Sequence, residues 1–122
     1  NMQAMFDNSQ AITIDLSSFN TSKITDMSWM FDNSKATTLD LSSFDTSKVT
    51  DMSNMFADSV NLKTIYSSNK FNTNAVTSST DMFSSCSSLV GGAGTKYDST
   101  NVDKTYARID GGTSNPGYFT AK

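Results

Sequence analysis

A repeat of fixed length is the feature that most constrains this chain. The stretch TLDLSSFDTSKVTDMSNMF (residues 38–56) closely repeats TIDLSSFNTSKITDMSWMF (residues 13–31), which begins 25 residues earlier. Met-Phe pairs recur at spacings of 25, 25 and 27 residues, and their methionines are Met5, Met30, Met55 and Met82. A period of about 20–29 residues is typical of leucine-rich-repeat solenoids. The sequence therefore predicts stacked copies of one unit, each too small to bury its apolar side chains alone.

The first half of each unit has the spacing of a β-strand. Leu39 and Leu41 alternate with polar residues, and Ile14 and Leu16 do the same one unit earlier. Alternation of this kind indicates a half-buried strand. The third unit keeps Ile65 at the matching position. We expect these strands to pair in parallel from unit to unit.

The second half of each unit has helical spacing. Val49, Met52 and Phe56 stand at positions i, i+3 and i+7, which favours one buried helical face. The segment is preceded by Asp45, a residue that caps helices well, and the corresponding residues are Asn20 and Asn72. Its interior is rich in Ser, Thr, Asp and Asn, which are poor helix formers. We therefore expect a short helix or 3-10 turn in each unit.

These patterns predict an α/β repeat fold, a leucine-rich-repeat-type solenoid with one short parallel strand and one short helix or 3-10 turn per unit of about 25 residues. Residues 1–90 would form about four units, the first truncated, and residues 91–122 a C-terminal cap of the same domain. The residues expected in the core of the second unit are Leu39, Leu41, Phe44, Val49, Met52, Met55 and Phe56. The residues expected to pack in the cap are Tyr97, Tyr106, Ile109, Tyr118 and Phe119.

Composition argues against several classes of function. The chain has 122 residues, a net charge of -3 and no histidine, so it lacks the basic patch of a nucleic-acid-binding protein and the commonest general base and metal ligand. Its single cysteine, Cys86, excludes a disulfide within the chain. Cys86 occupies a small-residue position that other units fill with serine, so we expect it to be buried and unreactive. We predict no catalytic activity, no cofactor, no metal and no membrane-spanning segment.

The repeat phrase and the closing segment together resemble one family. LDLSSFDTSKVTDMSNMF, followed by LVGGAGTKYDS and YARIDGGTSNPGYFT, is similar to the BspA-like leucine-rich-repeat surface proteins of bacteria over nearly the whole chain. The resemblance implies a secreted or cell-surface bacterial protein that acts in adhesion or protein recognition. It departs from the family pattern at Ala11 and Ala36, where a leucine usually opens the strand. Because the chain opens inside a repeat, we expect further units upstream and self-association through the exposed first unit.

Five residues are candidates for partner binding. Asp15 and Asp40 should lie one unit apart on the exposed strand face, next to Thr64 and Tyr66. Trp29 stands where the next unit has Asn54, and large aromatic side chains on a surface often anchor partners. In the alternative interpretation Asp15 and Asp40 are two solvated like charges held near each other by the repeat. For Trp29 the alternative is a residue that upstream units would cover.

Three functions compete at this point. The first is a module that binds a protein or host-matrix partner through its strand face. The second is a structural stalk that displays another domain, which the near identity of the first two units favours. The third is ice or crystal-surface binding by a threonine ladder, which the aspartates in the ladder disfavour.

Overall fold

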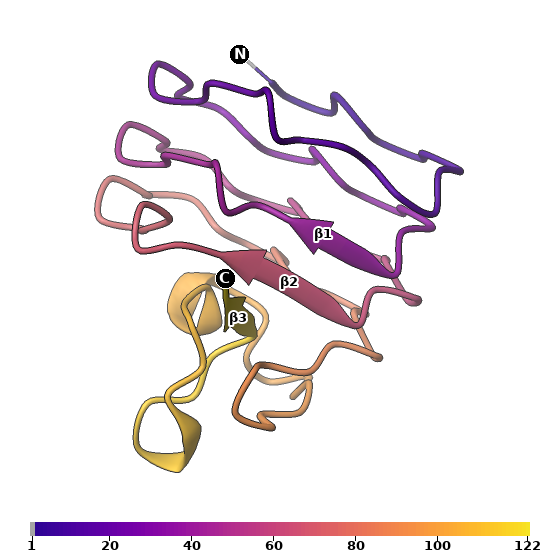
Figure 1. Cartoon of the computed structure of the whole chain (residues 1–122), viewed down its shortest axis with the longest axis vertical. Helices are drawn as coiled ribbons and strands as arrows, with labels where there is room; N and C mark the ends of the chain where they lie inside the picture. The colour runs from indigo at the N-terminus through magenta and orange to yellow at the C-terminus, as the bar shows by residue number, and fades with distance from the viewer. Residues whose placement is uncertain (1) are drawn as a thin grey trace.

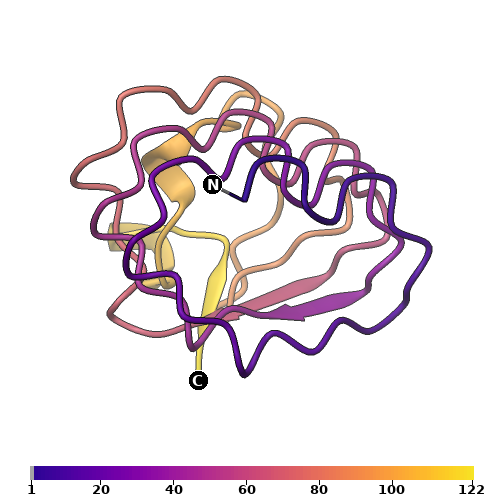
Figure 2. The same ribbon diagram turned by 90° about the horizontal axis from the view of Figure 1, so that it is seen from above.

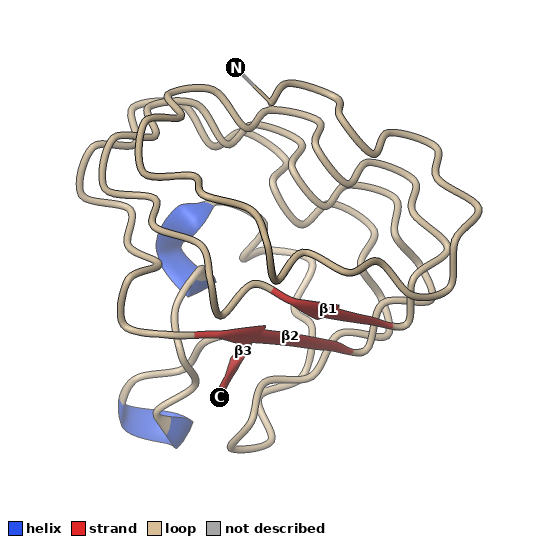
Figure 3. Ribbon diagram, turned by 45° about the horizontal axis from the view of Figure 1, so that its top comes forward, coloured by secondary structure: helices blue, strands red, loops and turns tan. Residues whose placement is uncertain are grey.

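The computed structural model describes residues 2–122 and consists of a small open parallel sheet, many turns and almost no helix. The strands are β1 (Thr38–Asp40), β2 (Thr64–Ser67) and β3 (Phe119–Ala121). Two 3-10 helices, η1 (Lys104–Tyr106) and η2 (Gly112–Ser114), lie in the C-terminal segment (Figures 1 and 3). This architecture is compatible with a repeat-like α/β fold.

The sheet has the order β1-β2-β3, with both pairs parallel. Its register places Leu39 beside Ile65 and Ile65 beside Phe119, and all three side chains are fully buried. Asp40 lies beside Tyr66 on the opposite face. Two consecutive units and the end of the chain therefore share one sheet, with an apolar inner face and a polar outer face.

The strand predicted for the first unit is absent. Ile14 and Leu16 lie in extended chain outside any strand, although Leu16 is buried. The hydrogen bond from the Ser43 hydroxyl to the Leu16 carbonyl, 3.1 Å long, ties this stretch to the second unit. No strand flanks it on its other side within residues 2–122. A segment paired on neither edge by a ladder of backbone hydrogen bonds is not a strand, whatever its alternation.

The short helix predicted for each unit does not form within residues 2–122, and the alternative, a 3-10 turn, is present only as isolated i→i−3 hydrogen bonds. Backbone N–H groups in the turn segment alternate between two kinds of acceptor. Those of Trp29 and Phe31 donate to the next unit, at 3.0 Å and 2.8 Å, whereas those of Met30 and Asp32 donate to carbonyls three residues back. A helix needs every N–H group for its own i−4 bonds. Here half of them form the bonds between units, so the segment is a series of turns.

Left-handed residues break each turn segment at two places. The position before each Met-Phe pair and the second position after it have positive φ, between 52° and 62°. These residues are Ala4, Asn8, Trp29, Asn33, Asn54, Asp58, Asp81 and Ser85. Asn and Asp adopt this conformation more readily than other residues with side chains. Their frequency at these positions is a local reason why the segment does not continue as a helix.

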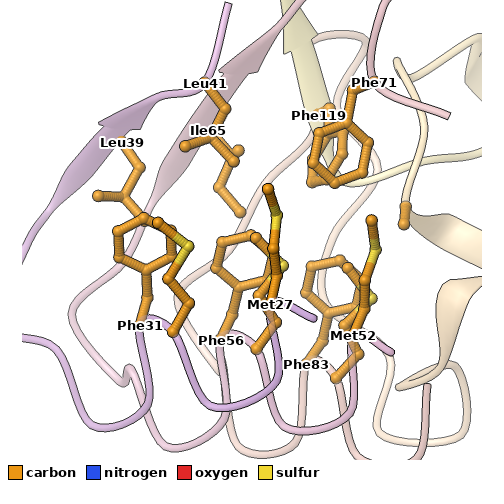
Figure 4. Close-up of a cluster of buried hydrophobic side chains, with 14 of the residues drawn as sticks. Met27, Phe31, Leu39, Leu41, Met52, Phe56, Ile65, Phe71, Phe83 and Phe119 are labelled. Atoms are coloured by element: carbon orange, nitrogen blue, oxygen red, sulfur yellow. The ribbon is translucent and has the colours of Figure 1, made fainter. Parts of the chain in front are cut away.

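The predicted core of the second unit is confirmed, since all seven of its residues are fully buried. The rings of Phe6, Phe31, Phe56 and Phe83 stack in one column, with centroid separations of 5.3–5.7 Å and interplanar angles of 4–7°. Figure 4 shows the last three of these rings beneath residues of the strands. Figure 2 shows the units following similar outlines, with the strands on one side and the turns on the other. One residue per unit thus builds a continuous aromatic core.

The burial of Cys86 is also confirmed. Its thiol donates to the Phe56 carbonyl, 2.9 Å away, and the Ser59 hydroxyl donates to the Phe31 carbonyl at 2.8 Å. Cysteine and serine therefore satisfy the same carbonyl position in successive units. Burial raises the pKa of Cys86 to about 12, so the thiol stays protonated and unreactive at neutral pH.

The C-terminal segment packs on the last repeat. Tyr118 and Phe119 are fully buried, whereas Tyr97, Tyr106 and Ile109 are partly buried against the same core. The Tyr118 hydroxyl donates to the Asn101 carbonyl at 2.8 Å. All five residues expected to pack here contact the core.

Candidate functional site

The outer face of the sheet carries a shallow hollow between the first two units. Its volume is about 320 Å³, and two of the predicted binding residues, Asp15 and Asp40, lie in its wall. The remaining lining residues are Ile14, Leu16, Ser17, Ser42 and Ser43. The predicted one-unit spacing of the two aspartates thus places both at one concave site, together with three serines and two aliphatic side chains.

Both carboxylates at the hollow are held in their charged form. The Ser17 hydroxyl and backbone N–H donate to Asp15, at 2.7 Å and 3.0 Å, and lower its pKa. Partial burial would raise the pKa of Asp40, but hydrogen bonds from Lys122 and Ser42 outweigh it and lower the pKa. Both groups are therefore ionised at neutral pH, and the hollow is anionic.

Lys122 completes the outer face in a way that the sequence did not indicate. Its ammonium group lies 2.8 Å from the Asp40 carboxylate and 4.9 Å from the centroid of the Tyr66 ring. The hydrogen bond and charge of Asp40 raise the pKa of Lys122. The contact depends on β3 pairing with β2, which brings the last residue of the chain beside residues from two repeats. No sequence spacing could have revealed it.

The structure gathers four of the five predicted binding residues on one face. Asp40 and Tyr66 are register neighbours, Thr64 lies two residues before Tyr66 in β2, and Asp15 shares the hollow with Asp40. Tyr66 and Thr64 are half-buried. Trp29 lies elsewhere, in a turn segment, with 42% of its surface exposed.

Trp29 also has an unusual backbone conformation. Its φ of 62° lies in the left-handed region, which a bulky residue adopts at a cost of about 1–2 kcal/mol. The matching position one repeat later is Asn54, with φ 56°. The conformation belongs to the turn, since the position before every Met-Phe pair has positive φ. The exposed ring is what makes Trp29 a candidate for partner binding.

Replacement of Trp29 by asparagine is expected to stabilise the protein by about 0.5–1 kcal/mol, because asparagine tolerates the left-handed conformation. Chemical denaturation should show a higher midpoint. The reverse change at the equivalent position, Asn54→Trp, is the matched control and should lower the midpoint. A fall in stability for Trp29→Asn would show that ring packing outweighs the backbone strain.

A second acidic group lies along the turn segments. Burial, a hydrogen bond with Asp7 and the nearby charges of Asp7 and Asp58 raise the pKa of Asp32 to about 6. Oδ1 of Asp32 is buried without a hydrogen-bond partner in residues 2–122. Repetition therefore places carboxyl groups close together, and Asp32 releases its proton only near pH 6.

Asp32 is expected to destabilise the fold as pH rises from about 4, the ordinary pKa of aspartate, to about 6. Over this interval the native state keeps a proton that the unfolded chain has released, so a higher pH favours unfolding. Asp32→Asn should remove this loss and be the more stable form above pH 6. The exposed control Asp98→Asn should not become more stable than the wild type above pH 6. If the free energies of unfolding of wild type and Asp32→Asn changed in parallel with pH, the prediction would be wrong.

Two negative findings apply to the part of the chain that the structure describes. No three His, Cys, Asp or Glu side chains there gather as a possible metal-ligand set. No helix there has the length and apolarity needed to cross a membrane.

Comparison with known proteins places the chain in a single family. A family model described as "Mycoplasma protein of unknown function, DUF285" matches residues 1–116. No curated protein and no solved structure matches the chain.

Proposed function

The chain belongs to the DUF285 family of unknown function, and we propose that it is a non-catalytic protein-binding or adhesion module of a bacterial surface protein. The observation that carries the proposal is the outer sheet face, where Asp15 and Asp40 line a hollow of about 320 Å³ and Tyr66, with Thr64 in the same strand, lies beside Asp40. This face combines charge, hydroxyl groups and an aromatic ring on paired strands. A rigid surface of this composition loses little conformational freedom when a partner binds.

The proposal includes a more specific fold than a repeat-like α/β structure. We infer a leucine-rich-repeat-type solenoid similar to the BspA-like surface proteins, with about four units in residues 1–90 and a cap in residues 91–122. The hydrogen bonds that join the turn segments of successive units support it, as does the column of stacked phenylalanines. A location on the cell surface or in the secreted fraction is part of the same proposal.

The chemistry of the face supports recognition rather than catalysis. Asp15 and Asp40 are ionised, and Asp40 already holds an ammonium group, that of Lys122. Lys122 also lies over the Tyr66 ring, so one cation contacts both the charge and the aromatic surface. Contacts of this kind suit a lysine or arginine side chain of a protein partner. The proposed role requires no cofactor and no metal.

The test is a binding assay of the wild-type chain against host extracellular-matrix proteins. Tyr66→Ala and Asp40→Ala should each weaken capture, because they remove the aromatic surface and the carboxylate that faces the hollow. Asp98→Ala, an exposed carboxylate change in the C-terminal segment, is the matched control and should bind like the wild type. Thermal melts of all variants would separate lost contacts from lost folding.

Two results would contradict the proposal. Undiminished binding by Tyr66→Ala and Asp40→Ala would place the site elsewhere, with Trp29 as the next residue to test. A wild-type chain that binds none of the matrix proteins would favour the alternative role, a stalk or spacer that displays another domain. The near identity of the first two units, residues 13–31 and 38–56, is the observation that supports the stalk.

A further inference from the structure

The N-terminal end of the repeat stack exposes apolar side chains that are buried in the next unit. Met5 is 51% exposed. Partly buried side chains of the same part of the chain also pack against the core, and these are Phe6, Ile14, Phe19 and Ile24. We call these five residues the N-terminal end face. An apolar surface at one end of a molecule is a candidate interaction site.

The molecule itself shows what covers such a surface. The residues 25 positions after Met5, Phe6, Ile14, Phe19 and Ile24 are all fully buried, and they are Met30, Phe31, Leu39, Phe44 and Val49. The preceding part of the chain lies on their N-terminal side, as the ring stacking of Phe6 on Phe31 at 5.5 Å illustrates. The same set of side chains is therefore covered by a preceding unit wherever a preceding unit is present.

The backbone of the end face specifies its occupant further. In every contact between units, N–H groups at alternate turn residues donate to the following unit. Phe6 donates to Met30, Phe31 to Met55 and Phe56 to Met82, at 2.8–2.9 Å. By this pattern the carbonyls of Met5 and Asp7 in the first unit point outward, and the hydrogen bonds within residues 2–122 leave both without a donor. The end face thus offers acceptors that match a partner with N–H donors at every second residue.

A second copy of this chain does not offer such a row of donors. Its own end face presents the same carbonyls, which cannot donate to one another. At its other end the equivalent donors are occupied, since Phe83 donates to the Val102 carbonyl and Ser85 to the Tyr97 hydroxyl. Head-to-head and head-to-tail association would each leave backbone acceptors unpaired.

We propose that the N-terminal end face is a docking surface for one further repeat unit of the TDMSxMF type. Donors at alternate residues of that unit would pair with the outward carbonyls, and its Met and Phe side chains would cover Met5 and Phe6. This surface lies at the end of the stack and not on the outer sheet face. The inference therefore goes beyond the proposed function and does not depend on partner binding at Tyr66.

The test joins a copy of residues 26–50 directly ahead of residue 1, which keeps the repeat in register. The fusion should unfold in one transition with a higher denaturant midpoint and a steeper denaturant dependence, because more surface is exposed on unfolding. Hydrogen exchange should slow at the copied Trp29, Phe31 and Asn33 amides. A control fusion carries serine at the copied Met27, Met30 and Phe31 positions, and its added amides should exchange freely.

Three results would overturn the inference. The copied amides could exchange as in an unfolded chain, or the control fusion could raise the midpoint equally. Alternatively, sedimentation could show that the parent chain is a dimer that Met5→Ser dissociates, in which case the occupant is a second copy. A parent that is monomeric, or whose association is insensitive to this change, together with a protected fusion would support a repeat unit.

Discussion

Replacement of Phe56 by alanine is expected to lower the free energy of unfolding by about 3–5 kcal/mol. Phe56 is fully buried, and its ring stacks on Phe31 at 5.7 Å and on Phe83 at 5.3 Å. It also meets the edge of Phe119 at 6.4 Å. The substitution removes contacts to the units on both sides and to the C-terminal segment, and neighbours fixed by their own hydrogen bonds cannot collapse into the cavity.

The matched control is Thr38→Ala on the exposed side of β1, which should change stability by less than about 0.5 kcal/mol. Urea denaturation followed by circular dichroism would measure both variants. Similar midpoints for the two variants would mean that the inner and outer faces have been assigned wrongly. A large loss for Phe56→Ala and none for Thr38→Ala would locate the stability in the aromatic column.

Asp110→Asn is expected to cost roughly 2–4 kcal/mol, because the carboxylate organises the C-terminal segment. Oδ2 accepts hydrogen bonds from the backbone N–H groups of Ala93 and Thr95, both at 2.9 Å. Oδ1 accepts from the Thr95 hydroxyl at 2.7 Å and from the N–H groups of Gly112 and Gly117. Both oxygens face donors, so an amide NH₂ would oppose a donor in either orientation.

The same group gives an acid-sensitive contribution to stability. Burial would raise the pKa of Asp110, but the hydrogen bonds from Thr95, Gly112 and Ala93 outweigh it and lower the pKa to about 2. The unfolded chain has a pKa near 3.9. The stabilisation is therefore complete above about pH 4 and is lost as pH falls towards 2.

The stability difference between wild type and Asp110→Asn should accordingly be largest at neutral pH and should shrink below about pH 4. Denaturation midpoints measured from pH 7 to pH 2 would show the convergence. Asp98→Asn is the control, because Asp98 is exposed and its Thr100 contacts are local. If the stability difference between wild type and Asp110→Asn were constant across this pH range, the loss would come from altered packing and not from the missing carboxylate charge.

The buried side of the molecule could be predicted from spacing because every unit repeats the same burial pattern. Leu39, Val49 and Phe56 are buried for the reason that the pattern indicated, since each faces its own copies in the neighbouring units. The helices could not be excluded in this way, because i, i+3, i+7 spacing fits a turn segment equally well. The difference lies in where the N–H groups of Trp29 and Phe31 donate, and that depends on a neighbour as well as on local sequence.

The candidate site was predictable to the same extent. Asp15, Asp40 and Tyr66 follow from period and alternation, and the structure places them on one face. Lys122 does not follow, because its contact with Asp40 depends on the C-terminal strand joining the sheet. The left-handed conformation of Trp29 could have been predicted from the sequence, because the matching position holds an asparagine, Asn54, and asparagine often adopts this conformation. The functional role of these residues stays a prediction until binding is measured.

The alternation of backbone donors limits how a chain of this kind can change its length during evolution. Suppose that one residue is inserted between Met27 and Asn33. The N–H groups that follow it and now donate to the next unit would then donate within the turn, and the reverse, much as a register slip inverts the faces of a strand. Insertions should be tolerated only outside it. The longer spacing from Met55 to Met82 agrees, because Phe56 still donates to Met82 and Asp58 to Ser84 in the usual order. Both additional residues therefore lie between residues 59 and 77, where drift in length leaves the stacking intact.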